Sequence, residues 1–218
     1  MMTDGYKDKY FSILGDSIST LAGYNPPECG VFYDWQNKRL ADILAPEDTW
    51  WGKVLEELGG KLLVNHSWAG STVCKLPGHE IESYGCSDAR TGALDWDGRK
   101  PDVVMVAMGL NDHGWRMPLS TEGADLTSFP VAYAAMLEKI RRNYPEAEIW
   151  CLTFPHIPYA AERAAGYHAA IYACAEKAGC RIVDIYHPDI VDTLDDLHPT
   201  RRGMQTIAGL VLEAVAKR

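Results

Sequence analysis

YFSILGDSI, residues 10–18, begins as an apolar run and ends in a glycine-containing turn. The run 10–14 is typical of a strand buried on both faces, and Gly15 lets the backbone turn sharply at its end. In an open α/β sheet, ligands bind beyond the carboxyl ends of the strands. The sequence therefore places the hydroxyl of Ser17 where a nucleophile is expected, although Gly-Asp-Ser is also an ordinary turn composition.

A histidine near the end of the chain has the partner that a catalytic base needs. Asp195 precedes His198 by three residues in TLDDLHPT, residues 193–200. A serine hydroxyl needs a base that takes its proton, and a carboxylate usually orients that base. Asp195 could accept a hydrogen bond from Nδ1 of His198, which leaves Nε2 to face Ser17. The alternative is a surface histidine ahead of a helix, with Pro199 in an early helical position.

Two further residues could stabilise the negative charge that develops on the former carbonyl oxygen of the substrate during acyl transfer. Gly70 follows a second apolar strand in VNHSWAGS, residues 64–71, and a glycine there lets its backbone N–H approach an oxygen closely. Asn111 lies in GLND, residues 109–112, straight after a third apolar run. Each such donor is worth about 3 to 4 kcal/mol in the transition state. Taken singly, both residues are also ordinary turn residues.

Apolar runs and helical patterns alternate along the whole chain. We expect strands at 10–14, 61–65, 103–108, 148–153 and 181–184, and helices from Thr49 to the glycines at 59 and 60, over 130–142, 160–178 and 203–217. The long connection 71–101 is expected to contain a short helix and to line the site. This alternation predicts an α/β fold with a mostly parallel sheet covered on both faces.

The four motifs, in this order, resemble those of the GDSL or SGNH hydrolase family. Carried over position by position, Ser17 resembles the nucleophile, His198 the base and Asp195 its orienter, while Gly70 and Asn111 resemble the oxyanion donors together with the backbone N–H of Ser17. Gly-x-Asn-Asp and Asp-x-x-His in the correct order make the match specific.

The resemblance also implies a fold and a reaction. It implies a flavodoxin-like, five-stranded α/β/α sandwich and ester hydrolysis through an acyl-serine intermediate, without a cofactor or metal. Ile18 and Ser19 stand where many members carry Leu and Thr, which leaves the catalytic roles untouched. Ser19 also excludes the Gly-x-Ser-x-Gly elbow of the α/β-hydrolases.

Other interpretations of the same residues stay open. Asp112 and His113, with Asp16, could form a metal cluster, although their spacing matches no recurrent ligand pattern and Asp16 is expected to bond loop amides. We expect small acyl groups on a polar or carbohydrate alcohol. Lysophospholipids, thioesters, an acyltransferase reaction and a non-catalytic carbohydrate-binding module are the alternatives. Trp68 and Trp115 could form an aromatic wall beside the site or pack in the core.

Composition bounds the function further. The 218 residues, 47% of them hydrophobic, predict a single domain over 1–218. The formal net charge of −9 argues against nucleic acid and anionic membranes and favours neutral substrates. Together with the family resemblance, this makes a small-molecule ester the expected partner. The chain has no run of about eighteen apolar residues and no signal-peptide pattern, so we expect a cytoplasmic protein with free cysteine thiols, unless a longer precursor is secreted.

Overall fold

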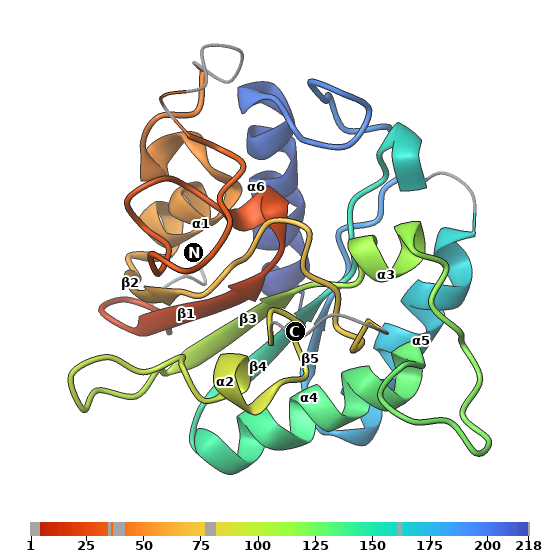
Figure 1. Ribbon diagram of the computed structural model, residues 1–218. Coiled ribbons are helices and arrows are strands. Elements are labelled where there is room, and N and C mark those ends of the chain that lie inside the picture. The colour runs from red at the N-terminus through yellow and green to blue at the C-terminus, as the bar shows by residue number, and fades with distance from the viewer. Residues whose placement is uncertain (1–4, 35, 37–41, 77–81, 161–162, 218) are drawn as a thin grey trace.

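Five parallel strands form one sheet at the centre of the molecule (Figure 1). The computed structural model describes residues 5–34, 36, 42–76, 82–160 and 163–217. The strands are β1 (Tyr10–Gly15), β2 (Lys61–Asn65), β3 (Val103–Ala107), β4 (Glu148–Leu152) and β5 (Arg181–Val183). All five predicted strands are confirmed to within about two residues at their ends, which is the usual uncertainty of such boundaries.

The order of the strands determines where a ligand can bind. The sheet has the order β2-β1-β3-β4-β5, which is that of flavodoxin-like proteins. The chain leaves β1 toward β2 on one side and then crosses to β3 on the other, so the order reverses at β1. A crevice opens beyond the carboxyl ends of the strands at such a reversal. The residues that follow β1 and β3 therefore meet at one place.

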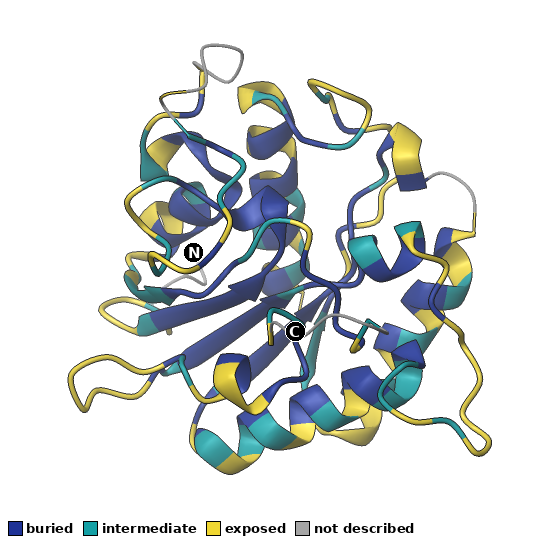
Figure 2. Ribbon diagram, in the orientation of Figure 1, coloured by how far each residue is buried: buried dark blue, intermediate teal, exposed yellow. Residues whose placement is uncertain are grey.

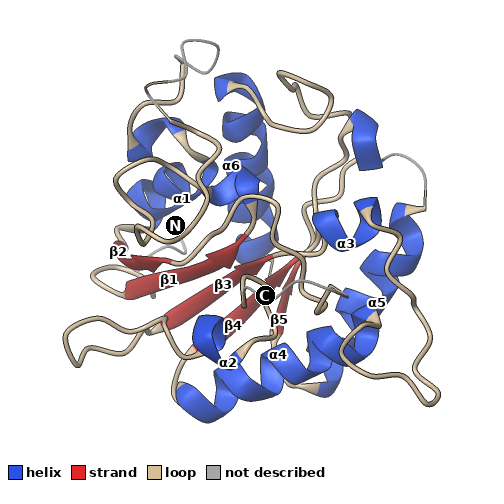
Figure 3. Cartoon of the chain, in the orientation of Figure 1, coloured by secondary structure: helices blue, strands red, loops and turns tan. Residues whose placement is uncertain are grey.

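Helices cover both faces of the sheet (Figures 1 and 3). One face carries α1 (Trp50–Leu58) and α6 (Arg201–Ala216), which pack against each other. The other face carries α2 (Asp88–Thr91), α4 (Phe129–Asn143) and α5 (Ala164–Lys177). Threonine side chains cap the amino ends of both helices on the first face. This arrangement confirms the predicted α/β fold with a five-stranded sheet flanked by helices.

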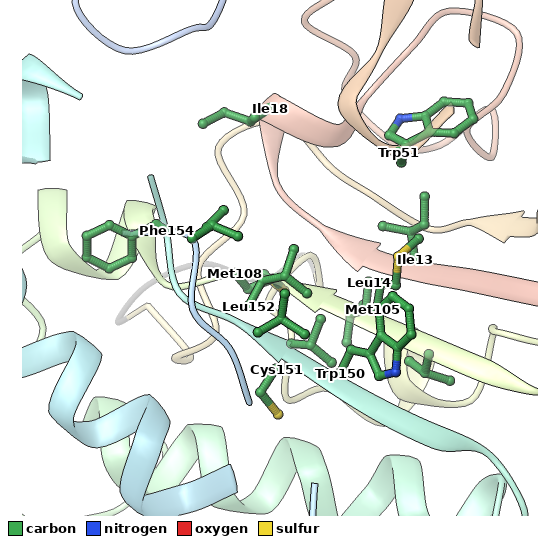
Figure 4. Packing of buried hydrophobic residues seen from close by; sticks show 14 of the residues in the cluster. Ile13, Leu14, Ile18, Trp51, Met105, Met108, Trp150, Cys151, Leu152 and Phe154 are labelled. Atoms are coloured by element: carbon green, nitrogen blue, oxygen red, sulfur yellow. The ribbon is translucent and has the colours of Figure 1, made fainter. Parts of the chain in front are cut away.

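The central strands β1, β3 and β4 are buried on both faces, as parallel strands covered by helices must be, whereas the edge strands β2 and β5 are only partly buried (Figure 2). Ile13, Met105 and Trp150 come from three neighbouring strands and lie in one row of the sheet (Figure 4). None of the three exposes any surface to solvent. Trp150 also packs edge-on against Tyr6 and Phe11. The sheet is thus a rigid base for the loops at its carboxyl edge.

The structure differs from the sequence-based expectation at a few points. Residues after β3, expected to form a turn, make the short helix α3 (Leu110–Gly114). The helix expected at 160–178 starts at Ala164, after a 3-10 turn at Pro158–Ala160, and residues 161–162 lie outside the described residues. Helix α2 is the short helix expected within 71–101. All six cysteines are free thiols. In the described part of the chain, every helix is too short or too polar to cross a bilayer.

Candidate active site

Ser17 lies directly beyond the carboxyl end of β1. It opens the 3-10 helix η1 (Ser17–Ser19), and Oδ1 of Asp16 caps that helix by accepting the Ile18 N–H at 3.0 Å. Asp16 is buried, and this burial raises the pKa of its carboxyl group to about 7. The backbone N–H of Ser17 donates no hydrogen bond to another described residue. The turn thus presents both the hydroxyl and one backbone donor of Ser17.

The structure brings Ser17, His198 and Asp195 together. Nε2 of His198 lies 3.0 Å from Oγ of Ser17, and Nδ1 lies 2.9 Å from Oδ2 of Asp195. Oδ1 of Asp195 also accepts the backbone N–H of His198 at 2.7 Å. The three groups form one hydrogen-bonded chain from carboxylate to hydroxyl. With Nδ1–H donated to Asp195, Nε2 is left as the acceptor for the serine proton.

The surroundings of His198 and Asp195 favour a neutral imidazole beside an ionised carboxylate. Burial lowers the pKa of His198, although Asp195 opposes that shift. Burial raises the pKa of Asp195, but the backbone and side chain of His198 outweigh this effect and the net shift is downward. The ring of Phe32 stacks on the imidazole with a centroid distance of 3.3 Å and an interplanar angle of 10°. Phe32 therefore supplies part of the cover that desolvates His198.

Gly70 occupies a turn that requires glycine. The N–H of Ser71 donates to the carbonyl oxygen of Trp68 at 3.1 Å, and Gly70 is the third residue of this turn. Its φ of 78° is the left-handed value that a type II turn needs at this position. The backbone N–H of Gly70 donates to no other described residue. The turn thus leaves a second backbone donor available at this edge of the sheet.

Asn111 reaches the same turn from α3. Its Nδ2 donates to the carbonyl oxygen of Ser71 at 2.9 Å. A carboxamide has two N–H donors, so this bond leaves one for another acceptor. Gly109 starts α3 with a φ of 122°, and a Cβ there would lie 3.1 Å from the ring of Phe129. This glycine allows α3 to begin close against Phe129 of α4, with Asn111 in the first turn of the helix.

The acidic residues of the alternative metal cluster are engaged elsewhere. The carboxylate of Asp112 accepts the backbone N–H groups of Val73 and Cys74 at 2.8 and 2.9 Å. Asp16 caps η1, as described above. Within the described ranges, no group of three or more His, Cys, Asp or Glu residues is placed to hold a metal ion. Both aspartates thus serve as acceptors that hold loops in place.

A polar hollow with an exposed indole adjoins the turn of Gly70. The hollow has a volume of about 220 Å³ and is lined by Ala69, Gly70, Thr72, Leu76, Ser83, Tyr84 and Trp115. Trp115 is 63% exposed, so core packing does not explain it, whereas Trp68 is half-buried. The residues Thr72, Ser83 and Tyr84 come from the connection 71–101, which was expected to line the site.

Two residues that support the site carry no motif in the sequence. Phe32 lies in a loop rich in proline and glycine, and nothing in its pattern points to a histidine far along the chain. Arg90 lies in α2 and donates to the carbonyl oxygen of Gly15, 75 residues away in the sequence. Neither contact could be found from local spacing, because both depend on how the loops fold over the sheet.

Comparison with known proteins identifies the family and the fold of this chain. The sequence matches the family described as GDSL-like Lipase/Acylhydrolase over residues 9–215, so the chain belongs to that family. A GDSL-like protein from Bacteroides ovatus has 26% sequence identity and a TM-score of 0.79, covering 97% of this chain and 100% of the other. One from Bacteroides uniformis has 27% identity and a TM-score of 0.76, covering 97% of each chain.

A more distant group of similar proteins acts on carbohydrates. The cellulase/esterase CelE of Acetivibrio thermocellus is 42% identical over 62 residues, which is 28% of this chain and 7% of that much longer protein. A family two carbohydrate esterase from Clostridium thermocellum has 20% identity and a TM-score of 0.64, covering 97% of this chain and 64% of the other. The latter shares the fold of this chain.

Proposed function

We propose that this protein is a serine esterase that hydrolyses carboxylic esters through an acyl-serine intermediate. The observation that carries the proposal is the unbroken chain from Asp195 through His198 to Oγ of Ser17. In such a chain the imidazole takes the serine proton while the carboxylate stabilises the imidazolium that forms. Membership of an acylhydrolase family supports the same reaction.

The reaction proceeds in two steps. Oγ of Ser17 attacks the ester carbonyl carbon as His198 takes its proton, and a tetrahedral oxyanion forms. The oxyanion accepts from the backbone N–H groups of Ser17 and Gly70 and from the carboxamide of Asn111. His198 returns the proton to the leaving alcohol, and the acyl group stays on Ser17. Water, deprotonated by His198, then attacks the acyl-enzyme, and His198 returns the proton to Oγ of Ser17 as the bond to the acyl group breaks and the carboxylic acid is released.

A small apolar cavity lies beside the residues that flank Ser17 in the chain. Asp16 and Ile18, the two neighbours of Ser17, line an apolar cavity of about 30 Å³ together with Leu110 and Phe154. A cavity of this size holds roughly one water-sized group. Ser17 itself does not line this cavity, and we propose that the acyl group reaches it past Asp16 and Ile18. An acetyl methyl group fits such a space, whereas a long acyl chain would have to displace the packed side chains around it. We therefore propose acetyl esters as the preferred substrates.

The hollow beside Gly70 supports a polar alcohol. An exposed indole such as that of Trp115 offers an apolar face on which a sugar ring can lie, and the polar groups of Thr72 and Ser83 border the same hollow. Similarity to part of CelE, a cellulase/esterase, supports a carbohydrate alcohol as well. The proposed substrate is accordingly an acetylated carbohydrate.

Hydrolysis of p-nitrophenyl acetate, butyrate and octanoate and of glucose pentaacetate tests the proposal. Acetate should be the best of the three chain lengths, and Ser17→Ala should lower all rates by at least about a thousandfold. Trp115→Ala should raise KM for glucose pentaacetate by about fivefold and leave KM for p-nitrophenyl acetate unchanged, since stacking is worth roughly 1 kcal/mol. Trp96→Ala is the matched control, because Trp96 is 70% exposed on a different hollow.

Each outcome bears on a separate part of the proposal. A wild type that hydrolyses none of the esters, or a Ser17→Ala variant that keeps its rate, would refute the serine esterase. A preference for octanoate would refute the small acyl pocket. Equal effects of Trp115→Ala and Trp96→Ala on the sugar ester would remove the carbohydrate subsite and leave the hydrolase.

A further inference from the structure

Arg90 is a buried cation whose hydrogen-bonding capacity is fully used. It is 1% exposed, and its guanidinium group has five N–H donors. Nε donates to Nδ1 of His66 at 3.3 Å, Nη1 to Oγ of Ser71 and to the carbonyl oxygen of Ser83, and Nη2 to the carbonyl oxygens of Gly15 and His66. Five donors thus meet five acceptors.

All five acceptors are uncharged. Burial lowers the pKa of His66 to about 4, so its ring is neutral at pH 7 and can accept at Nδ1. Removing a guanidinium group from water is costly unless its donors are satisfied. Burial lowers the pKa of Arg90 only to about 10, which leaves the group charged at neutral pH. The fold therefore keeps a full positive charge buried near the site. The free-energy cost of desolvating that charge calls for an explanation.

The acceptors come from three segments that surround the site. Gly15 ends β1 two residues before Ser17, His66 and Ser71 lie in the stretch after β2 that includes the turn of Gly70, and Ser83 lies in the connection before α2. The carbonyl oxygen of Gly15 also accepts the N–H of Trp68 at 3.1 Å. Arg90 thus joins the strand that carries the nucleophile to the turn that carries a backbone donor.

Ser71 connects Arg90 to both candidate oxyanion donors, the N–H of Gly70 and the carboxamide of Asn111. Its Oγ accepts from Arg90 and donates to the carbonyl oxygen of Ser83 at 2.6 Å. Its own carbonyl oxygen accepts Nδ2 of Asn111 at 2.9 Å. Gly70 is its immediate neighbour in the chain. The position of Ser71 therefore determines where the N–H of Gly70 and the carboxamide of Asn111 lie.

We propose that Arg90 is a positioning residue for the oxyanion hole, acting through Ser71 on Gly70 and Asn111. This inference rests on the proposed esterase function. Lysine would be a poor replacement, because an ammonium group has three donors without the planar fork that reaches three segments at once.

Steady-state kinetics of Arg90→Met, Arg90→Lys and Ser71→Ala on p-nitrophenyl acetate test the inference, together with inhibition by phenylboronic acid. The boronate forms a tetrahedral adduct with a serine Oγ and so reports on the oxyanion donors. We expect kcat to fall about 100-fold in Arg90→Met and about 10-fold in Ser71→Ala, with Arg90→Lys between them and KM nearly constant. Ki for the boronate should rise in parallel with the loss of kcat/KM.

The double variant Arg90→Met/Ser71→Ala should lose little more than Arg90→Met alone, because the contact with Arg90 that Ser71→Ala removes is already absent in Arg90→Met. Arg142→Met is the matched control, since Arg142 is a mostly exposed arginine on α4 that pairs with Asp88. If Arg90→Met does not fold, as judged by circular dichroism, the same kinetic test is made with Ser71→Ala, Arg90→Lys and the double variant that combines them.

Three results would overturn the inference. The first is an unchanged kcat in the folded Arg90 variants. The second is a loss of kcat in the double variant that equals the product of the two single losses. The third is a boronate Ki that stays constant while kcat falls. The wild type and Ser17→Ala separate this failure from that of the proposed function. If the wild type hydrolyses the ester and Ser17→Ala does not, only the role of Arg90 is refuted, and if the wild type is inert, both proposals fall.

Discussion

The two sides of the site are held by different kinds of contact. Ser17 and Asn111 follow strands β1 and β3, where hydrogen bonds join segments far apart in the chain. The bond from Arg90 to Gly15, two residues before Ser17, is buried, and the bond from Asn111 to Ser71 is partly buried. Asp195 and His198 lie three residues apart in one loop and hold each other directly. The side chain of Asp195 is 48% exposed, whereas that of His198 is 10% exposed. The nucleophile side thus depends on contacts between distant segments, and the base side on a local pair whose carboxylate is half-exposed.

This difference determines how each side should respond to substitution. An interior contact cannot be replaced by water, so its loss leaves a donor or acceptor unsatisfied. A half-exposed carboxylate can be replaced in part by solvent, because water reaches the same ring nitrogen. We therefore expect larger losses on the nucleophile side than on the base side when a supporting group is removed.

Asn111→Ala should give the largest loss of the three substitutions considered below. Removal of a donor from an oxyanion hole lowers kcat by about 10² to 10³. The loss should fall on kcat rather than on KM, because the oxyanion exists only in the transition state. The measurement is steady-state hydrolysis of p-nitrophenyl acetate. Asn143→Ala is the control, since Asn143 donates to a carbonyl oxygen at the end of α2. A loss below threefold would mean that Asn111 does not face the oxyanion.

Asp195→Asn should have a smaller effect and shift the pH profile. A buried orienting aspartate is worth about 10⁴-fold, and the exposure of Asp195 should reduce this loss to roughly 30-fold. Asp195 raises the pKa of His198 against the lowering effect of burial. Since activity requires the neutral imidazole, activity is lost as the pH falls through this pKa. Without the carboxylate the pKa falls further, so the acid limb of kcat/KM should move to lower pH.

The control for this substitution is the next residue. Asp196→Asn changes the same charge by the same amount on an exposed residue with a φ of 65°, a conformation that asparagine tolerates. It should leave both the rate and the acid limb in place. An equal shift in both variants would show that the net charge of the loop, rather than the contact with Nδ1, sets the pKa of His198.

The same contrast explains what the sequence could predict. Asp195 and His198 are recognisable because their contact spans three residues, and Ser17 and Asn111 are recognisable because each follows an apolar strand. The alternation of strands and helices likewise predicts the parallel sheet. The short helix α3 was missed because Gly109 and the residues after it have the composition of a turn. Arg90 and Phe32 act across long stretches of chain, and no periodicity or spacing encodes such contacts.

Phe32→Ala should give the smallest loss and move the acid limb in the opposite direction. The stacked ring contributes to the burial that lowers the pKa of His198. Without that ring water reaches the imidazole, so its pKa should rise and the acid limb should move to higher pH. The imidazole also gains freedom, and kcat should fall by about fivefold, as expected for the loss of a contact worth roughly 1 kcal/mol.

Two companion variants separate the possible causes in the pH profile of kcat/KM. Phe32→Leu keeps apolar cover without a flat ring, so it should keep the acid limb near that of the wild type if burial is the cause. Tyr24→Ala, on the same loop and 44% exposed, should change neither rate nor profile. If Phe32→Ala instead moved the limb to lower pH, as Asp195→Asn should, Phe32 would act by orienting His198 toward Asp195 rather than by excluding water. The base side would then depend on contacts between distant segments as much as the nucleophile side does.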